Sequence, residues 1–262
     1  MKTTLFAAAA AAFLAWAPAA QAALKTKAVE YKQGDTTLQG FIAYDDAVKE
    51  KRPGVLVVHE WWGHNQHARN QAIRLAKAGY VAFALDMYGK GKVAKHPDDA
   101  KKFMAEATSD LATMDARFDA AKEFLKKDPR VDPTKIAAVG YCFGGAVVLG
   151  QARAGEDLQV VGTFHGALGT SNPAQPGKVK ARILVQNGAA DPMIPQDQVD
   201  AFKKEMDAAG ARYEVINYEG ALHSFTNPDA SKAKVEGLGY NAEVDKKSFD
   251  KLLETFKQVF GS

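Results

Sequence analysis

Short, almost continuous runs of apolar residues recur along this chain and constrain its fold more than any other feature. Six runs are rich in β-branched or aromatic residues, at positions 55–58, 80–85, 136–139, 160–164, 183–185 and 213–216. A strand that is apolar at nearly every position must be covered on both faces, which is typical of a parallel sheet between layers of helices. The runs therefore predict an α/β fold with the strands in its interior.

Between these runs the apolar residues repeat every three or four positions, which is the period of an amphipathic helix. Such helices are predicted at residues 111–125, 199–209 and 249–259. Ahead of them, Gly34-Asp35 separates two strand-like segments and predicts a hairpin at the edge of the sheet. The pattern as a whole predicts a mostly parallel, twisted sheet with helices on both faces, and a site at the carboxyl ends of the strands.

The N-terminus has the pattern of a secretory signal peptide. Lys2 precedes an alanine-rich apolar run, and Ala20-Gln21-Ala22 is a small-residue cleavage pattern. The run is shorter than the ~20 residues that a membrane-spanning helix needs, and Pro18 interrupts its end. We predict an exported, periplasmic protein with a signal peptide at 1–22 and one α/β domain at 23–262.

The charged residues are balanced and dispersed. Lys and Arg number 34, Asp and Glu number 31, and the formal net charge is +3. A nucleic-acid-binding surface needs a concentrated basic patch, and the sequence has none. We therefore expect a monomer that acts on a small molecule, with no nucleic-acid partner and no membrane partner once the signal peptide is removed.

Cys142 is the only cysteine, so it cannot form an internal disulfide. An isolated free cysteine is usually a small buried hydrophobe, but the neighbours of Cys142 indicate another role. The strand at 136–139 leads into Gly140-Tyr141-Cys142-Phe143-Gly144-Gly145 and then into a helical stretch. This is the strand, turn and helix arrangement of a nucleophile elbow, whose glycines make room for a strained backbone. The helix N-terminus favours a reactive thiolate.

A nucleophile elbow predicts an acid and then a histidine further along the chain, each on a loop after a strand. Asp191 follows the strand at 183–185, and His223 follows the strand at 213–216. Alone, each would be a turn former or a structural residue; together, in this order, they complete a Cys142-His223-Asp191 triad. His223 would move the protons and Asp191 would orient its ring. The fold class predicted is thus the α/β-hydrolase fold.

The loop after the strand at 55–58 is where such hydrolases supply a second oxyanion-hole donor. Its sequence is His59-Glu60-Trp61-Trp62-Gly63-His64. We predict that the backbone N–H groups of Trp61 and Phe143 stabilise the oxyanion of a tetrahedral intermediate.

The elbow sequence, the Asp191 loop, His223-Ser224-Phe225 and Glu60 ahead of an aromatic residue resemble the dienelactone hydrolase family. The resemblance spans the chain after residue 22 and includes the cysteine in place of a serine. It implies cleavage of an ester-like or lactone-like acyl bond through a thioester, with no cofactor. It also implies that Glu60 restrains the resting nucleophile.

The chain departs from the family at two positions. Family members that act on muconate lactones hold the substrate carboxylate with two arginines, and Lys90 and Asn227 stand in their places. Neither residue offers the bidentate fork of arginine. Trp62, Lys90 and His165 are expected in the substrate pocket, whose aromatic residues would suit a more apolar substrate.

Three other functions compete with this interpretation. His59, His64 and His67 cluster around Glu60, but the H-E-x-x-H spacing of a zinc hydrolase is not met, so no metal is predicted. A non-catalytic binding protein on a hydrolase scaffold is the main alternative. A redox sensor at Cys142 is the third, and the complete triad argues against both.

Overall fold

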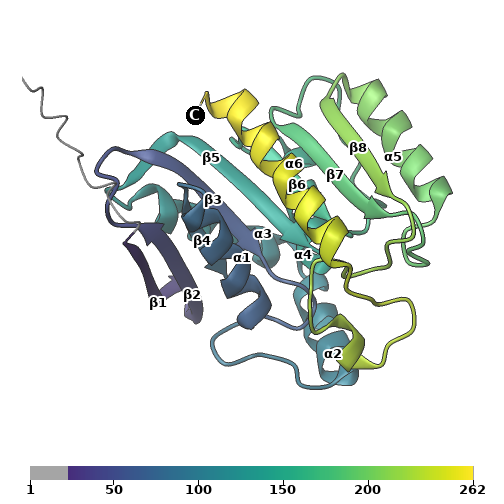
Figure 1. Ribbon diagram of the computed structural model, residues 1–262, viewed down its shortest axis with the longest axis horizontal. Coiled ribbons are helices and arrows are strands. Elements are labelled where there is room, and N and C mark those ends of the chain that lie inside the picture. Colours follow the sequence, from purple (N-terminus) through teal and green to yellow (C-terminus); the bar gives the residue numbers. More distant parts are fainter. Residues whose placement is uncertain (1–22, 262) are drawn as a thin grey trace, which may run out of the picture.

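Within residues 23–261, eight strands form one sheet in the order β1-β2-β4-β3-β5-β6-β7-β8 (Figure 1). The structure is a computed structural model and describes residues 23–261. The predicted signal peptide at 1–22 lies outside the described residues and stays a prediction. The strands are β1 (Leu24–Gln33), β2 (Thr36–Asp45), β3 (Arg52–Val58), β4 (Val81–Leu85), β5 (Val131–Tyr141), β6 (Val160–Phe164), β7 (Arg182–Gly188) and β8 (Arg212–Tyr218).

In the described part of the chain, six helices connect or follow the strands. They are α1 (Gln66–Lys77), α2 (Pro97–Thr108), α3 (Leu111–Lys126), α4 (Phe143–Ala154), α5 (Gln196–Ala209) and α6 (Ala242–Phe260), and a 3₁₀ turn covers Ala230–Ala233. None of the helices among residues 23–261 has the length and apolar composition needed to cross a bilayer.

The sheet is parallel from β4 to β8 and antiparallel only at the edge formed by β1 and β2. The predicted hairpin is confirmed, and Gly34 takes a positive φ of 54° at its turn. The central strands β3, β4, β6 and β7 are buried along almost their whole length, as their apolar runs predict. β8 is the exception because it is the other edge strand and is only half buried.

Two hydrophobic cores lie on opposite faces of the sheet. Alternate β3 side chains divide between them, with Leu56 in the first core and Val57 in the second. Helices α3, α4 and α5 contribute to the first core, and α1 and α6 contribute to the second. Figure 1 shows the same layering, with α1 and α6 in front of the sheet.

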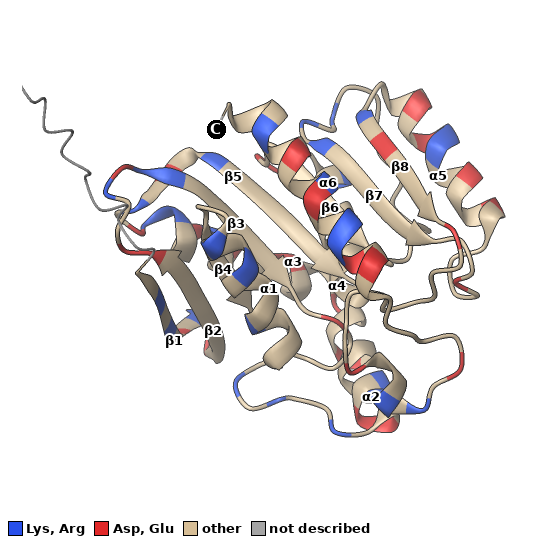
Figure 2. Cartoon of the chain, in the orientation of Figure 1, with Lys and Arg blue, Asp and Glu red and all other residues tan. Residues whose placement is uncertain are grey.

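The parallel strands bring distant loops to one rim of the sheet. The loops that follow the carboxyl ends of β3, β5, β7 and β8 carry the residues that the sequence assigns to the site. Figure 2 shows acidic and basic residues interspersed over the helices, without a stripe of one sign. The fold therefore presents one rim with the predicted chemistry and an unremarkably charged exterior.

Candidate active site

Cys142 lies at the sharp turn between β5 and α4. Its backbone has φ 53° and ψ −116°, a conformation that is strained for a residue with a side chain. The Cys142 N–H donates to the Phe164 carbonyl at 3.0 Å, and the Cys142 carbonyl accepts from the Gly145 N–H at 2.9 Å. These bonds hold the turn in place and leave the side chain half buried at the N-cap of α4. The elbow predicted from sequence is therefore formed.

The glycines of the elbow are required by close backbone contacts. A Cβ at Gly140 would lie 2.0 Å from the Gly144 carbonyl oxygen, and one at Gly144 would lie 2.4 Å from the Val58 carbonyl oxygen. The Gly144 N–H also donates to the His59 carbonyl at 3.1 Å. The elbow thus packs directly against the end of β3, which brings the loop with Glu60 and Trp61 beside Cys142.

Asp191 and His223 are paired. His223 Nδ1 is 2.7 Å from Asp191 Oδ2, and the other carboxylate oxygen accepts from the Met193 N–H at 2.8 Å. The Asp191 and His223 loops contact each other, because the Ala190 N–H donates to the Ala221 carbonyl at 3.0 Å. Both side chains are buried. The carboxylate is therefore fixed in the orientation that keeps a proton on Nδ1 and leaves Nε2 free to act.

The charge on His223 is coupled to Cys142. Burial would lower the pKa of His223, but the negative charge of the Cys142 thiolate and the hydrogen bond to Asp191 outweigh it and raise the pKa to about 10. His223 Nε2 has no hydrogen-bond partner within residues 23–261. A negative charge at Cys142 and the hydrogen bond to Asp191 therefore both favour the protonated ring of His223.

Cys142 and His223 line one cavity of about 340 Å³. Its other walls are mostly apolar and include Trp61, Met104, Phe143 and Ile194. We call it the catalytic cavity. Met104 lies on α2 and Ile194 follows the Asp191 loop, so segments far apart in the sequence enclose the thiol. A small, largely apolar ligand suits these walls.

A family model named "Dienelactone hydrolase family" matches residues 38–260. The chain belongs to this family. Membership makes it a hydrolase of carboxylic esters or lactones with an α/β-hydrolase fold, as the resemblance of its motifs predicts.

Known relatives match most of the chain. "Protein usf" of Aquifex pyrophilus is 32% identical over 203 residues, which is 76% of this chain and 86% of that protein. Among solved structures, m3DLH is 34% identical with a TM-score of 0.86. A dienelactone hydrolase-like promiscuous phosphotriesterase from metagenomic libraries is 32% identical with a TM-score of 0.85. In both cases 90% of this chain and 99% of the solved chain are covered.

Glu60 is buried, and both of its carboxylate oxygens contact the segment that carries His223. Ser224 Oγ donates to Oε1 at 2.7 Å, and Asn227 Nδ2 donates to Oε2 at 2.6 Å. His67 Nδ1 is 3.8 Å from Oε2. Sequence reasoning noted Asn227 only as a departure from the family's arginine and missed that it binds Glu60. The structure therefore links Glu60 to the His223 loop.

The two predicted oxyanion donors lie at the catalytic cavity, since Trp61 and Phe143 both line it. Phe143 is the first residue of α4, where the N–H has no helical acceptor. The Tyr88 hydroxyl donates to the Trp61 carbonyl at 3.1 Å and fixes that loop, a contact for which the sequence carries no clear signal. The rings of Phe143, His59 and Tyr88 pack against one another.

The three residues expected in the substrate pocket lie outside the catalytic cavity lining. Lys90 forms an exposed ion pair with Glu30 at 2.6 Å. Trp62 packs edge-on against Trp61, with ring centroids 5.0 Å apart. His165 is fully buried, and its Nε2 is 2.9 Å from Thr226 Oγ1.

His165 packs edge-on against His223, with the two ring centroids 5.2 Å apart. Burial holds the pKa of His165 well below its usual range, so the ring is neutral at physiological pH. The neutral ring therefore adds no positive charge beside His223.

The histidines of the β3 loop have separate structural partners. His59 Nε2 accepts from the Met87 N–H at 3.1 Å, and His67 Nε2 is 3.2 Å from the Thr226 carbonyl. Burial lowers the pKa of His64 to about 4. Within residues 23–261, no three His, Cys, Asp or Glu side chains are grouped so that they could hold a metal ion.

Proposed function

We propose that this hydrolase cleaves ester-like or lactone-like acyl bonds through a thioester at Cys142, with His223 and Asp191 completing the triad. The observation that carries the proposal is geometric: Cys142 lies at a strained elbow and lines one cavity with His223, whose Nδ1 is 2.7 Å from Asp191 Oδ2. Such a couple supplies a nucleophile and a proton donor at the same pH.

In the acylation step, the Cys142 thiolate attacks the acyl carbon, and the carbonyl oxygen becomes an oxyanion. The N–H groups of Phe143 and Trp61 donate to this oxygen. When the intermediate collapses, His223 Nε2 gives its proton to the departing alkoxide. The products of this step are a free alcohol, or the opened hydroxyl end of a lactone, and a thioester on Cys142.

In the deacylation step, the sulfur of Cys142 is part of a neutral thioester and no longer carries a negative charge. One cause of the raised pKa of His223 is then missing, while burial still lowers the pKa. The neutral imidazole accepts a proton from water, and the resulting hydroxide attacks the thioester. The sulfur leaves as the thiolate, and the imidazolium pairs with it again.

Trapping the intermediate tests this proposal. After mixing with p-nitrophenyl acetate and quenching in acid, the protein should carry one acetyl group on Cys142. Mass spectrometry of the intact chain and of its peptides locates the group, and hydroxylamine should remove it because it cleaves thioesters. An acyl group on any other side chain, with Cys142 unmodified during turnover, would contradict the thioester.

We further propose that Glu60 positions the His223 segment. In Glu60→Gln the amide oxygen can still accept from Asn227 Nδ2, and the amide N–H can donate to the Ser224 hydroxyl. The kcat of this variant should therefore fall less than tenfold. Glu60→Ala leaves both partners buried and unpaired, at about 1–3 kcal/mol each, so a fall in kcat of roughly 30-fold or more is expected. Steady-state kinetics of the two variants provide the comparison.

The alternative role of Glu60, restraint of the resting thiol, depends on its charge. Equal losses in Glu60→Gln and Glu60→Ala would favour that role over positioning. Rescue by glutamine alone would support positioning, because glutamine lacks the charge but keeps the hydrogen bonds.

Export to the periplasm is also proposed, on the N-terminal pattern ending at Ala22. N-terminal sequencing of the exported chain should then begin at Ala23.

A further inference from the structure

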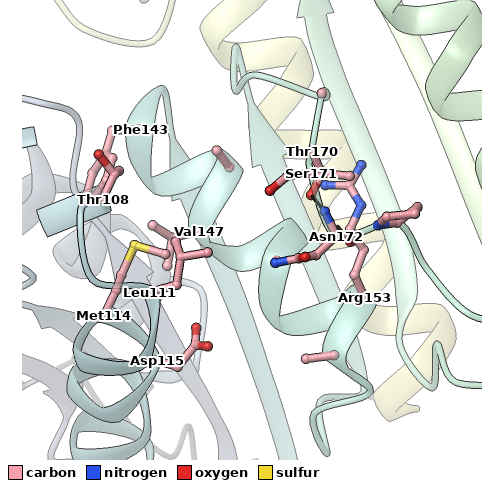
Figure 3. A pocket seen from close by; sticks show the side chains of 15 residues that line it. Thr108, Leu111, Met114, Asp115, Phe143, Val147, Arg153, Thr170, Ser171 and Asn172 are labelled. Carbon is pink, nitrogen blue, oxygen red and sulfur yellow. Dashed lines mark hydrogen bonds between the residues drawn. The ribbon is translucent and has the colours of Figure 1, made fainter. Parts of the chain in front are cut away.

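A second cavity, of about 430 Å³, lies beside the catalytic cavity. Helix α4 forms its floor, the start of α3 forms one wall, and the loop at 169–173 forms the other (Figure 3). Thr108, Phe143 and Ala146 line both cavities. The second cavity therefore begins at the wall of the first, and we call it the lateral groove.

The floor of the lateral groove is a track of small residues that starts at the nucleophile. Cys142 and, within α4, Ala146, Gly150 and Ala154 are partly or fully exposed, whereas every other residue of α4 is buried. Their spacing of four places them on one face of the helix. At ~1.5 Å per residue, Gly150 lies roughly 12 Å along the helix from Cys142.

The wall next to the catalytic cavity is apolar. Leu111, Met114 and Val147 line it, and Figure 3 shows them together with Phe143 on the side opposite Thr170, Ser171 and Asn172. Leu111 is 43% exposed and is one of four large hydrophobic side chains left exposed in the described part of the chain. Another of the four, Met193, lines the catalytic cavity. Exposed apolar side chains gathered at two adjoining cavities are typical of a binding site.

The charged groups of the lateral groove are already paired. Arg153 Nε donates to Glu205 Oε1 at 2.8 Å, and Arg153 Nη2 donates to the Leu168 carbonyl at 2.6 Å. Asp115 accepts from Gln151 at 2.6 Å, and burial raises the pKa of its carboxyl. A substrate carboxylate would find no free cation here. A neutral aliphatic chain matches these surroundings better.

We propose that the lateral groove holds the acyl chain of a neutral, medium-length aliphatic ester while its carbonyl is attacked by Cys142. This inference rests on the proposed function of Cys142. The acyl part is favoured over the alcohol part because Phe143, the expected oxyanion donor, lines both cavities. His223, which would protonate the leaving group, lines the catalytic cavity and, among residues 23–261, is not part of the groove lining.

Gly150→Phe tests the groove by filling it. A Cβ at Gly150 meets no atom within 4 Å, and the residue lies inside a helix, so a side chain can be added without moving the backbone. We expect kcat/KM for p-nitrophenyl octanoate to fall by roughly 60-fold if three methylenes lose burial at about fourfold each. The acetate ester is too short to reach Gly150, so its kcat/KM should change less than twofold.

Ala208→Phe is the matched control, because it adds the same ring to an exposed position of α5 outside both cavities. It should change neither ester. Equal losses for both esters in Gly150→Phe, or no loss for octanoate, would overturn the groove proposal. A loss for octyl acetate instead of the octanoate would assign the groove to the alcohol part and overturn the acyl assignment.

Binding separates this inference from the proposed function. Octanamide binding to the Cys142→Ala variant, measured by calorimetry, needs no turnover. Adding Gly150→Phe should weaken this binding at least tenfold. If it does so while the wild-type protein hydrolyses no ester, the groove stands and the thioester proposal fails; unchanged binding would overturn the groove whatever the activity.

Discussion

Cys142→Ala is expected to lower kcat for ester hydrolysis by about 10⁴- to 10⁶-fold, the range seen when a triad nucleophile is removed. Alanine cannot form the bond to the acyl carbon, so only binding and the oxyanion donors remain to speed attack by water. Alanine also adopts the elbow backbone as well as cysteine does, since both carry a Cβ. Initial rates with p-nitrophenyl acetate, corrected for the buffer reaction, give the ratio.

Cys142→Ser provides a sharper comparison at the same position. A serine hydroxyl is neutral at physiological pH, so it does not supply the negative charge that raises the pKa of His223, whereas burial still lowers that pKa. The serine variant should therefore be far less active than wild type although its nucleophile has the same placement. Thermal unfolding followed by circular dichroism should show both variants folded.

If folded Cys142→Ala kept a tenth or more of the wild-type rate, another residue would have to be the nucleophile. If instead wild type and Cys142→Ala both lacked activity against aryl esters, lactones and thioesters, a non-catalytic binding protein would become the better interpretation. The two outcomes are distinct because only the second removes the activity of the wild type.

The sheet could be predicted from the sequence because each central strand is apolar on both faces. The strand at Val160–Phe164 was located to the residue, and the ends of β3 and β7 were placed within three residues. Helices α1 and α2 were not predicted. α1 buries three alanines and Leu75 beside the polar His67 and Gln71, and α2 buries only Ala100 and Ala107, so few large apolar side chains mark their buried faces.

The placement of the three residues of the proposed triad could be predicted because their order along the chain is fixed by the fold. Cys142 can be recognised by the glycines around it, because a Cβ at these glycines would clash with the backbone. Asp191 and His223 each follow a strand. The partners of Glu60 could not be predicted, because Ser224 and Asn227 reach it only through the path of the loop after β8. Lys90 is expected in the pocket because of its position in the family motif. Its ion pair with the exposed Glu30 could not be predicted, because Glu30 lies far away in the sequence on β1.

The contribution of α2 to the catalytic cavity could not be predicted from the sequence either. Met104 and Thr108 line it from a helix that lacks a motif, and Thr108 also lines the lateral groove. The lining of the catalytic cavity thus depends on packing between elements far apart in sequence. The elbow depends on a local motif, which is why its position could be predicted and the cavity lining could not.

The second large effect is expected from Asp191→Asn. One Asp191 oxygen accepts from His223 and the other from the Met193 N–H. Asparagine has a single oxygen, so its amide must face one of these partners. If it faces His223, it donates to Nδ1 and places the ring proton on Nε2, where the imidazole cannot accept a proton from the thiol. We expect kcat to fall by about 10³- to 10⁴-fold.

The pH profile should move as well. In the wild type the imidazolium persists through neutral pH, and kcat/KM should fall only as the pH rises through about 10, where His223 loses its proton. Asp191 favours the protonated ring through its hydrogen bond and its charge, so its removal lowers the pKa of His223. The alkaline limb of the Asp191→Asn profile should therefore lie at lower pH than that of the wild type.

Asp250→Asn serves as the control, because it removes an exposed carboxylate of α6 that pairs with Lys246 on the same helix. Its rate and pH profile should match those of the wild type. An Asp191→Asn enzyme with a reduced rate but an unmoved alkaline limb would show that a group other than His223 controls that limb. A shift toward higher pH would contradict the ion pair itself, since loss of a neighbouring negative charge can only make an imidazolium easier to deprotonate.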